Sequence, residues 1–349
     1  MLKALWTGEY EEASEARLSG LFSLTRVGLN VTGSLNDLLD EDHLIDALHG
    51  VDVLIAGYDN VTARVLESSP DLKVILSGRD GPEENVDMGA CTEMGIPVFS
   101  GGGRCAHSVS ELTLALMLDL SRSITRSASY IQRNGWTSVE EQETFGFGNV
   151  ELYGKTLSII GLGKNGRALA RIARGLGMNI VAYDPYVSAE TAEELGVELV
   201  GLMEAMAAGD YVCTLARVTD ETRGMIGAEQ VAAMKPSAYF VNTGRAALTD
   251  DEAILDALEQ GRIRGAAFDV FPQEPLGPSS RYYEIPEDRI ILTPHIAGLS
   301  VDRVPHQYEN LLNGFCAFRN GERSIDNLYN PDVFDSATFP TRGGSLLRR

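Results

Sequence analysis

The stretch LSIIGLGKNGRALARIARGLGMNIVAYD, residues 157–184, decides the fold. An apolar, strand-like run leads directly into a glycine-rich turn, which is followed by apolar residues at helical spacing. In this turn Gly161 permits a tight bend, Gly163 leaves room for a pyrophosphate against the backbone, and Gly166 lets the helix pack close to the strand. The free N–H groups at the start of the helix attract the anion. The stretch therefore predicts a dinucleotide-binding βαβ unit.

A second apolar run, residues 179–183, ends in Asp184, about 20 residues beyond the glycines, where dinucleotide-binding folds carry an acid. This carboxylate would accept hydrogen bonds from the adenosine ribose hydroxyls and repel a 2′-phosphate, so we expect NAD rather than NADP. Lys164 and Asn165 lie between the glycines and are expected to contact the same cofactor. A glycine-rich turn without a ligand is the alternative, which the surrounding strand, helix and acid disfavour.

The length and charge of the chain limit the classes of protein to which it can belong. Its 349 residues, 44% of them hydrophobic, exceed what one hydrophobic core usually supports, so we expect two domains. No apolar run reaches membrane-spanning length and the first residues lack signal-peptide features, so we expect a cytoplasmic protein with no membrane contact. The net charge of −21 opposes binding to nucleic acid and requires a local cation to hold an acid substrate. An acid-rich surface suited to a saline environment is another explanation of the charge.

The cysteines indicate neither a disulfide framework nor a metal site. They are far apart, at Cys91, Cys105, Cys213 and Cys316. No CxxC or Cys/His pairing occurs among them, so buried reduced thiols are expected and no metal is predicted.

Strand-like and helix-like segments alternate through the first 103 residues, which is typical of a parallel sheet covered by helices. We expect strands at 2–6, 51–56, 73–77 and 96–99 and helical segments at 14–24 and 36–48. No glycine fingerprint follows the first strand, so this unit is not an obvious nucleotide site. Three glycines, residues 101–103, then form a candidate interdomain hinge.

A long apolar-periodic segment, residues 109–131, is too apolar for a surface helix, and we expect it to be buried in the interior or between subunits. The α/β alternation resumes after the nucleotide unit. We expect strands at 210–215, 238–242, 263–268 and 289–292, helices at 250–259 and 299–318, and a polar C-terminal tail.

The loop GRDGPEEN, residues 78–85, follows a predicted strand at its carboxyl end, where open α/β sheets place their ligands. Arg79, Asp80 and Gly81 are therefore candidate substrate-binding residues. An ordinary solvated turn is the alternative, with equal weight.

Three segments in the second half each follow a predicted strand and should meet at the edge of the sheet that holds the pyrophosphate. They are VNTGRAALTD with Arg245, FDVFPQEP with Asp269 and Glu274, and LTPHIAG with His295. Each alone has an ordinary structural explanation: a solvated arginine, a turn, a satisfied histidine. Together they supply an acid/base pair and a carboxylate-binding cation beside a nicotinamide site, which suits hydride transfer to a 2-oxo acid.

These motifs resemble those of the D-isomer-specific 2-hydroxyacid dehydrogenases. The likeness covers nearly the whole chain and rests on NVD (85–87), SELTLALML (110–118), GLGKNG (161–166), VTDETRGMIG (218–227), VNTGR (241–245), DVFPQEP (269–275) and TPHIAG (293–298). It implies an α/β protein with two Rossmann-like or flavodoxin-like parallel-sheet domains. The NAD-binding domain, residues 104–298, would be inserted in a discontinuous substrate domain, residues 1–103 and 299–349, with a cleft that closes on the substrate. It also implies a homodimer built largely through the NAD-binding domain.

The resemblance further implies a role for each matching residue. His295 would exchange a proton with the substrate oxygen, Glu274 would hydrogen-bond the other ring nitrogen, and Arg245 would bind the substrate carboxylate and carbonyl oxygen. The remaining cofactor contacts would be Thr219, Thr243, Gly244 and Asp269, the last of these holding the nicotinamide carboxamide.

The sequence leaves the substrate open, because the loop 78–85 is more acidic than the family pattern. Two other functions remain as alternatives: an NAD-responsive, corepressor-like interaction protein, and a formate or phosphite dehydrogenase on the same scaffold. Retention of Arg245, Glu274 and His295 together argues against the first, since a sensor needs no acid/base pair.

Overall fold

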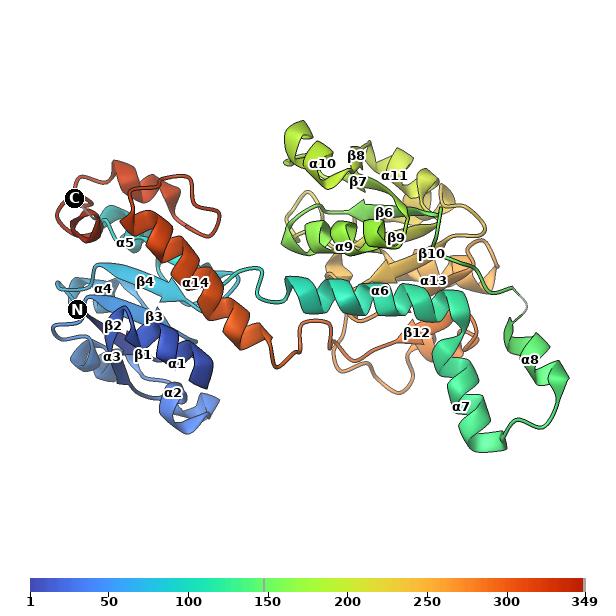
Figure 1. Cartoon of the computed structure of the whole chain (residues 1–349), viewed down its shortest axis with the longest axis horizontal. Helices are drawn as coiled ribbons and strands as arrows, with labels where there is room; N and C mark the ends of the chain where they lie inside the picture. Colours follow the sequence, from blue (N-terminus) through green and yellow to red (C-terminus); the bar gives the residue numbers. More distant parts are fainter. Residues whose placement is uncertain (147, 348–349) are drawn as a thin grey trace. The chain divides into compact units, whose positions relative to one another are not determined.

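The computed structural model describes residues 1–146 and 148–347. They form two compact units, each built around its own parallel sheet (Figure 1). The first unit joins Met1–Arg104 to Val301–Arg349, and the second is Cys105–Ser300. This architecture confirms the predicted α/β fold class. No helix in the described part of the chain is long and apolar enough to cross a bilayer.

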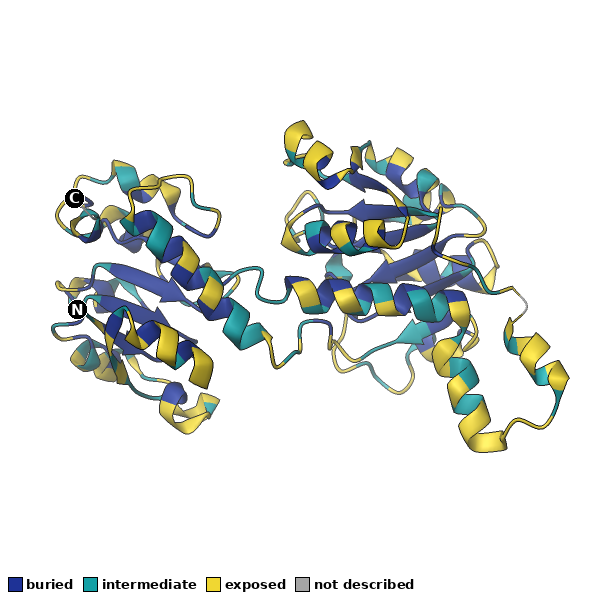
Figure 2. Cartoon of the chain, in the orientation of Figure 1, coloured by how far each residue is buried: buried dark blue, intermediate teal, exposed yellow. Residues whose placement is uncertain are grey.

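The sheet of the first unit has five strands in the order β2-β1-β3-β4-β5, all paired in parallel. The strands are β1 (Leu2–Trp6), β2 (Phe22–Arg26), β3 (Val53–Ala56), β4 (Val74–Ser77) and β5 (Val98–Ser100). The helices are α1 (Glu12–Ser19), α2 (Leu29–Thr32), α3 (Glu41–Ala47), α4 (Ala63–Glu67), α5 (Met88–Glu93) and α14 (Arg303–Arg319), with short 3-10 helices η1 (Leu35–Asp37), η2 (Pro82–Glu84), η5 (Pro331–Asp335) and η6 (Gly343–Leu346). Every residue of β3 and β4 is buried, as expected for strands covered on both faces (Figure 2).

The sheet of the second unit has seven strands in the order β12-β11-β10-β9-β6-β7-β8, again all parallel. The strands are β6 (Thr156–Ile160), β7 (Asn179–Tyr183), β8 (Glu198–Leu199), β9 (Tyr211–Thr214), β10 (Tyr239–Asn242), β11 (Gly265–Phe268) and β12 (Ile290–Leu292). The helices are α6 (Ala106–Arg122), α7 (Ile124–Asn134), α8 (Val139–Gly146), α9 (Lys164–Gly175), α10 (Ala189–Leu195), α11 (Leu202–Ala208), α12 (Ala228–Ala232) and α13 (Asp251–Glu259), with 3-10 helices η3 (Ala246–Leu248) and η4 (Arg281–Glu284).

The strand order of the second sheet reverses between β6 and β9. The chain runs outward through β7 and β8 on one side of β6 and returns to build β9 to β12 on the other side. Open parallel sheets bind ligands at the carboxyl ends of the strands at such a switch point. The turn that follows β6 is the glycine-rich turn of residues 161–166, so the fold places it at this position.

The helical segment predicted at 14–24 is wrong in its second half. Helix α1 ends at Ser19, and the chain then forms the edge strand β2. In β2 a buried Phe22 is followed by alternating exposed and half-buried side chains. This period of two is typical of a strand and not of a helix.

The single long helix predicted at 109–131 is also wrong. It breaks at Ser123, whose φ of 52° is left-handed, and α7 begins at the next residue. The Asp119 carboxylate accepts a 2.8 Å hydrogen bond from the backbone N–H of Thr125 and so satisfies a donor in the first turn of α7. Helix α6 buries one face, whereas no residue of α7 is buried, so only the first half is interior.

The C-terminal tail, expected to be polar, contributes to the core of the first unit. Its buried residues Leu328, Val333, Phe339 and Leu346 pack in the same cluster as Phe315 and Phe318 of α14. These apolar residues are scattered without a regular period, so the sequence pattern did not indicate that the tail would pack against the first unit.

Candidate functional site

The glycine-rich turn of the second unit has the geometry that a dinucleotide requires. Gly161 has φ 101°, and a Cβ there would lie 2.4 Å from the backbone of Ala216. A Cβ on Gly166 would lie 2.3 Å from the carbonyl oxygen of Gly161, so both positions exclude a side chain. A Cβ on Gly163 would meet no atom within 4 Å. Gly163 caps the twelve-residue helix α9, so the space in front of the helix start is open to an anion.

Asp184 lies directly after β7 and holds the glycine-rich turn. Its Oδ2 accepts a 2.8 Å hydrogen bond from the backbone N–H of Leu162, and its Oδ1 accepts one of 3.0 Å from Tyr186. Lys164 and Asn165, which the sequence predicts to contact the cofactor, lie in the first turn of α9. The acid and the turn therefore lie at one site.

A cavity of about 520 Å³ lies in the same unit, at the carboxyl ends of β10 and β11. It is lined by Val218, Arg245, Ala246, Ala247, Thr249, Val270, Phe271, Pro272, Glu274 and His295. The structure thus brings together the three predicted catalytic residues, which come from three separate segments. Thr249 and Phe271 also line the cavity; they lie inside VNTGRAALTD and FDVFPQEP, but the sequence did not mark either residue as functional.

His295 and Glu274 form a direct pair in the lining of this cavity. The ring Nδ1 of His295 lies 2.6 Å from Glu274 Oε2, and Glu274 Oε1 accepts a 2.9 Å hydrogen bond from the backbone N–H of Phe271. Burial raises the pKa of Glu274, but the bonds from His295 and Phe271 outweigh it, and the net effect is a lowered pKa. The carboxylate is therefore kept ionised beside the imidazole.

Arg245 lies on the loop after β10, with its side chain exposed to solvent. Its guanidinium Nη1 donates a 2.8 Å hydrogen bond to the carbonyl of Gly244. Thr243 is buried, and its hydroxyl lies 2.6 Å from that of Thr113 on α6. Thr219 lies in an exposed turn after β9, where its hydroxyl is 3.2 Å from that of Thr222.

Asp269 has no exposed surface, and its carboxylate binds the segment that carries His295. Oδ1 accepts hydrogen bonds from the Thr293 hydroxyl at 2.6 Å and the Ile296 N–H at 2.9 Å, and Oδ2 accepts one from the Ala297 N–H at 2.8 Å. His295 itself has a left-handed φ of 52°. The contacts that the structure gives this carboxylate are thus with the histidine loop.

The predicted substrate loop lies in the first unit, after β4. The Arg79 guanidinium is paired with Glu84 and lies 5.1 Å from the centre of the Tyr58 ring. Asp80 Oδ1 accepts a 3.1 Å hydrogen bond from the backbone N–H of Gly103. Gly81 precedes the 3-10 helix η2. The loop is thus held by its own charges and by the glycine segment.

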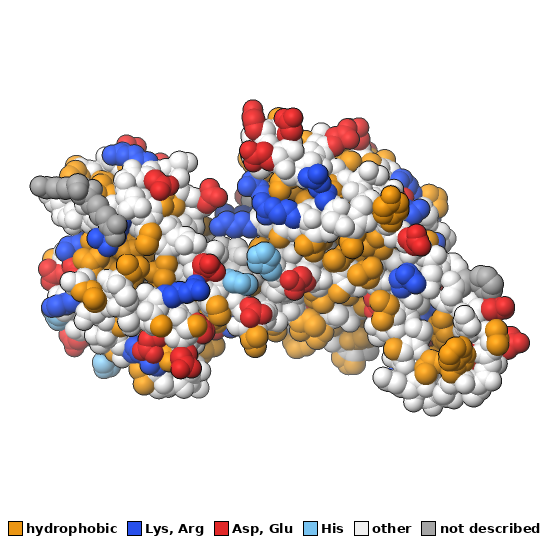
Figure 3. Space-filling model, viewed as in Figure 1, with side chains coloured by type: hydrophobic (Ala, Val, Ile, Leu, Met, Phe, Trp, Pro, Cys, Tyr) orange, Lys and Arg blue, Asp and Glu red, His pale blue; other side chains and the backbone are white. Residues whose placement is uncertain are grey.

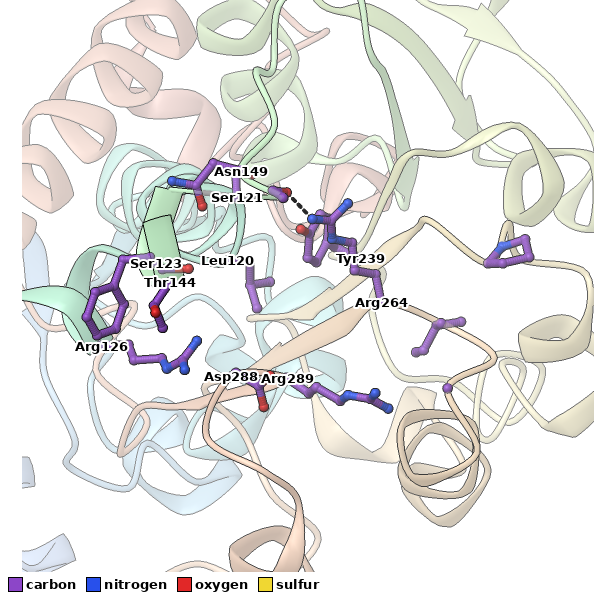
Figure 4. A pocket seen from close by; sticks show the side chains of 15 residues that line it. Leu120, Ser121, Ser123, Arg126, Thr144, Asn149, Tyr239, Arg264, Asp288 and Arg289 are labelled. Carbon is purple, nitrogen blue, oxygen red and sulfur yellow. Dashed lines mark hydrogen bonds between the residues drawn. The ribbon is translucent and has the colours of Figure 1, made fainter. Parts of the chain in front are cut away.

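A second cavity, of about 300 Å³, lies at the opposite, amino ends of β10, β11 and β12 (Figure 4). Three arginines line it, Arg126, Arg264 and Arg289, and Arg264 donates a hydrogen bond to the carbonyl of Gly148. None of the predicted site residues lines this cavity. The first cavity is the candidate active site, because it contains the acid/base pair.

Comparison with known proteins gives consistent matches. A model of the NAD binding domain of the D-isomer specific 2-hydroxyacid dehydrogenases matches residues 114–297. The chain is 40% identical over 260 residues to a D-3-phosphoglycerate dehydrogenase from Methanocaldococcus jannaschii, covering 74% of this chain and 48% of that protein. It is 32% identical over 292 residues to a glyoxylate reductase from Korarchaeum cryptofilum, covering 83% and 86%. The solved structure of the PH0520 protein from Pyrococcus horikoshii OT3 has a TM-score of 0.76 at 25% identity and covers 100% of both chains.

The chain spans about half the length of the phosphoglycerate dehydrogenases that it matches, 48% of the M. jannaschii protein and 56% of one from Synechocystis. The family model, in contrast, matches more than half of this chain, and the likeness to the glyoxylate reductase extends over most of both proteins. The chain therefore belongs to the D-isomer specific 2-hydroxyacid dehydrogenase family, and residues 114–297 are its NAD-binding domain.

Proposed function

We propose that this protein is an NAD-dependent dehydrogenase that interconverts a D-2-hydroxy acid and the corresponding 2-oxo acid. The observation that carries the proposal is the cavity in which Arg245 and the His295–Glu274 pair meet, in the same unit as the glycine-rich turn. An acid/base pair and a planar cation are what a 2-oxo acid requires: one donates a proton to the carbonyl oxygen and the other binds the carboxylate.

The turn fits a dinucleotide. The open space at Gly163 would admit a pyrophosphate at the start of α9, and Asp184, which holds the turn, would accept the ribose hydroxyls. When bound, the nicotinamide supplies the hydride for reduction or accepts it for oxidation. We propose further cofactor contacts at Lys164, Asn165, Thr219, Thr243 and Gly244.

The side chains of the cavity supply the remaining chemistry. With Nδ1 held by Glu274, the Nε2 of His295 gives a proton to the developing alkoxide during reduction and removes the hydroxyl proton during oxidation. The ionised Glu274 stabilises the imidazolium form that reduction needs. Arg245 binds the substrate carboxylate through its planar fork and orients the carbonyl.

Asp269 was predicted to contact the nicotinamide carboxamide, and we propose that it also fixes His295. Its bonds to the Thr293 hydroxyl and to the backbone N–H groups of Ile296 and Ala297 hold the residues on both sides of the histidine, which stabilises the left-handed φ there. An Asp269→Asn variant should have a kcat lower by roughly tenfold or more, because a displaced His295 transfers the proton less efficiently. Fluorescence titration separates the roles: an unchanged Kd for NADH supports positioning alone, and a weakened Kd supports the carboxamide contact.

The reaction class is tested with a panel of 2-oxo acids monitored at the nicotinamide absorbance. The panel contains glyoxylate, hydroxypyruvate, 3-phosphohydroxypyruvate and larger 2-oxo acids, with formate and phosphite in the oxidative direction. NADH oxidation with a 2-oxo acid supports the proposal. Turnover of formate or phosphite alone, or of nothing, contradicts it. Arg79, Asp80 and Gly81 stay candidate substrate residues, tested by alanine variants at the first two positions against the same panel.

We also propose that the first unit is the substrate domain and that the protein forms a homodimer through the second unit. Hydrophobic side chains lie exposed on and around α7, including Ile124, Ile131, Trp136 and Val139, and Trp136 is 66% exposed. Figure 3 shows hydrophobic side chains gathered at this end of the second unit. Light scattering should give twice the chain mass, and Trp136→Glu should weaken the dimer; a monomer at micromolar concentration contradicts this proposal.

A cytoplasmic location is part of the same proposal. All four cysteines are free thiols, and Cys91 and Cys213 are buried, which suits a reducing compartment.

A further inference from the structure

Four polar side chains, three of them buried and one (Thr249) half-buried, are connected by hydrogen bonds next to the loop that carries Arg245. This set runs from Tyr282 in η4, through Asp251 at the start of α13, to Thr249 and Asn242. Tyr282, Asp251 and Asn242 are at most 6% exposed, and none of these three lines the active-site cavity. The proposed mechanism assigns them no role.

Asp251 is the centre of this set. One carboxylate oxygen accepts a hydrogen bond from the Tyr282 hydroxyl, and the other accepts one from the Thr249 hydroxyl. Burial raises the pKa of the Asp251 carboxyl, and the two hydroxyl donors oppose the shift. A buried carboxylate is costly unless its oxygens are satisfied, so removal of either donor disturbs the whole set.

Asn242 connects the set to the loop of Arg245. Its side-chain N–H group donates to the Thr249 hydroxyl at 3.4 Å and to the backbone carbonyl of Arg245 at 3.3 Å. Its amide oxygen accepts the backbone N–H of Gly244 at 3.1 Å. The buried side-chain amide of Asn242 thus restrains the backbone of both Gly244 and Arg245, and so the position from which the Arg245 side chain extends.

Tyr282 also supports the turn that carries Glu274. Its ring packs edge-on against Phe268 and Phe271, with ring centres 5.2 Å apart in both pairs. Phe271 in turn donates its backbone N–H to Glu274. The neighbouring Arg281 ties η4 to helix α13 through ion pairs with Glu252, Asp256 and Glu259.

We propose that Tyr282 and Asp251 are positioning residues that hold Arg245 and the Glu274 turn in one fixed relation to each other. The inference rests on the proposed function of Arg245 as the carboxylate-binding cation. Two loops that are far apart in sequence must both be placed accurately around one substrate, and a shared buried anchor achieves this without touching the substrate.

The first test is Tyr282→Phe, which keeps the ring and removes the hydroxyl. We expect KM for the best 2-oxo acid to rise and kcat to fall, each on the order of tenfold, because the carboxylate-binding cation and the acid/base pair lose their alignment. The Kd for NADH should stay unchanged, since the glycine-rich turn is elsewhere. Tyr283→Phe is the matched control: this neighbouring tyrosine is 56% exposed, and the variant should behave as wild type.

The second test is a double-mutant cycle with Arg245→Lys, which removes the planar fork. If Tyr282 acts through Arg245, Tyr282→Phe should add little to the KM defect of Arg245→Lys. Circular dichroism melting checks folding, and Asp251→Asn replaces Tyr282→Phe in the cycle if that variant does not fold. If Arg245→Lys leaves KM unchanged, the proposed function of Arg245 fails. If Arg245→Lys raises KM but Tyr282→Phe has no effect, or its effect adds in full, the positioning role is overturned while the function of Arg245 stands.

Discussion

The first strand-to-helix turn of each sheet offers a direct comparison. In the first unit, β1 is followed by Gly8 and Glu9, and a Cβ on Gly8 would lie 2.9 Å from the hydroxyl of Tyr308. In the second unit, β6 is followed by the glycine-rich turn, and a Cβ on Gly163 would meet no atom within 4 Å. The turn after β1 is covered by another side chain, whereas the turn after β6 has open space in front of Gly163.

Helix α14 covers the first turn. Its Tyr308 donates to the backbone carbonyl of Glu9 and accepts a 2.7 Å hydrogen bond from the Trp6 indole, and its Arg303 binds the Glu9 carboxylate through bonds of 2.6 and 3.2 Å. The backbone carbonyl and the carboxylate of Glu9 are thus both bound within the unit.

At the start of α1 the Glu11 carboxylate accepts hydrogen bonds from the backbone N–H groups of Ala13 and Ser14 at 2.9 and 2.7 Å, whereas the N-cap residue of α9 is Gly163, which has no side chain to do this. The start of α9 therefore suits an external anion, and the start of α1 does not.

The largest expected effect lies at the edge of the second sheet. His295→Gln should lower the rate of 2-oxo acid reduction by roughly 10² to 10⁴, because it removes the group that transfers the proton. Stopped-flow measurement of the chemical step checks this, with NADH affinity expected to change little. His43→Gln in the first unit is the control, because His43 is an exposed residue paired with Asp40. Near-normal turnover of the His295 variant would contradict the acid/base role.

A pair of glycine variants tests the open and covered turns directly. Gly163→Val should weaken NADH binding by about tenfold or more, because the side chain occupies the pyrophosphate space, and should leave Tm unchanged. Gly8→Ala should lower Tm, because its Cβ would lie 2.9 Å from the Tyr308 hydroxyl, and should leave NADH binding unchanged. Calorimetric titration and thermal melting give both quantities, and the comparison fails if the two variants exchange these phenotypes.

Asp184 should make the cofactor site of the second unit prefer NADH over NADPH. We expect kcat/KM to favour NADH over NADPH by at least about tenfold, since placing a 2′-phosphate beside a carboxylate should cost on the order of 1.4 kcal/mol or more. Steady-state kinetics with both cofactors measures the ratio. Equal use of the two would contradict the role of Asp184.

Glu274→Gln should produce the smallest effect, a shift of the pH profile by about one unit toward lower pH. The hydrogen bonds to Glu274 lower its folded pKa, so the charge of its carboxylate is fully present above the ordinary pKa of a glutamate and is lost as pH falls through the folded value. Glutamine keeps a hydrogen-bonding group but has no charge to favour the imidazolium. The profile of kcat/KM for reduction measures the shift, and an unchanged profile would show that the charge has no role.

Much of this protein was predictable because its signals are local. The nucleotide unit lies entirely within residues 157–184 and consists of a strand, three glycines, a helix and Asp184. The backbone angles and spacings that it requires depend on residue types at fixed positions, which can be recognised in the sequence. The segments around Arg245, Glu274 and His295 each follow a strand, and parallel strands end at a common edge, so their meeting at one cavity was also expected.

Other features depended on residues brought together from distant parts of the chain. The bonds of Asp269 to the His295 loop, the cover that α14 places over the Gly8 turn, and the Tyr282–Asp251 anchor next to the loop of Arg245 all join segments that no local pattern relates. A spacing rule reports the conformation of a segment, but which buried carboxylate meets which donor is settled only by the packing of the whole unit. The sequence alone thus determined the kind of site, and the tertiary structure decided how its loops are held in place.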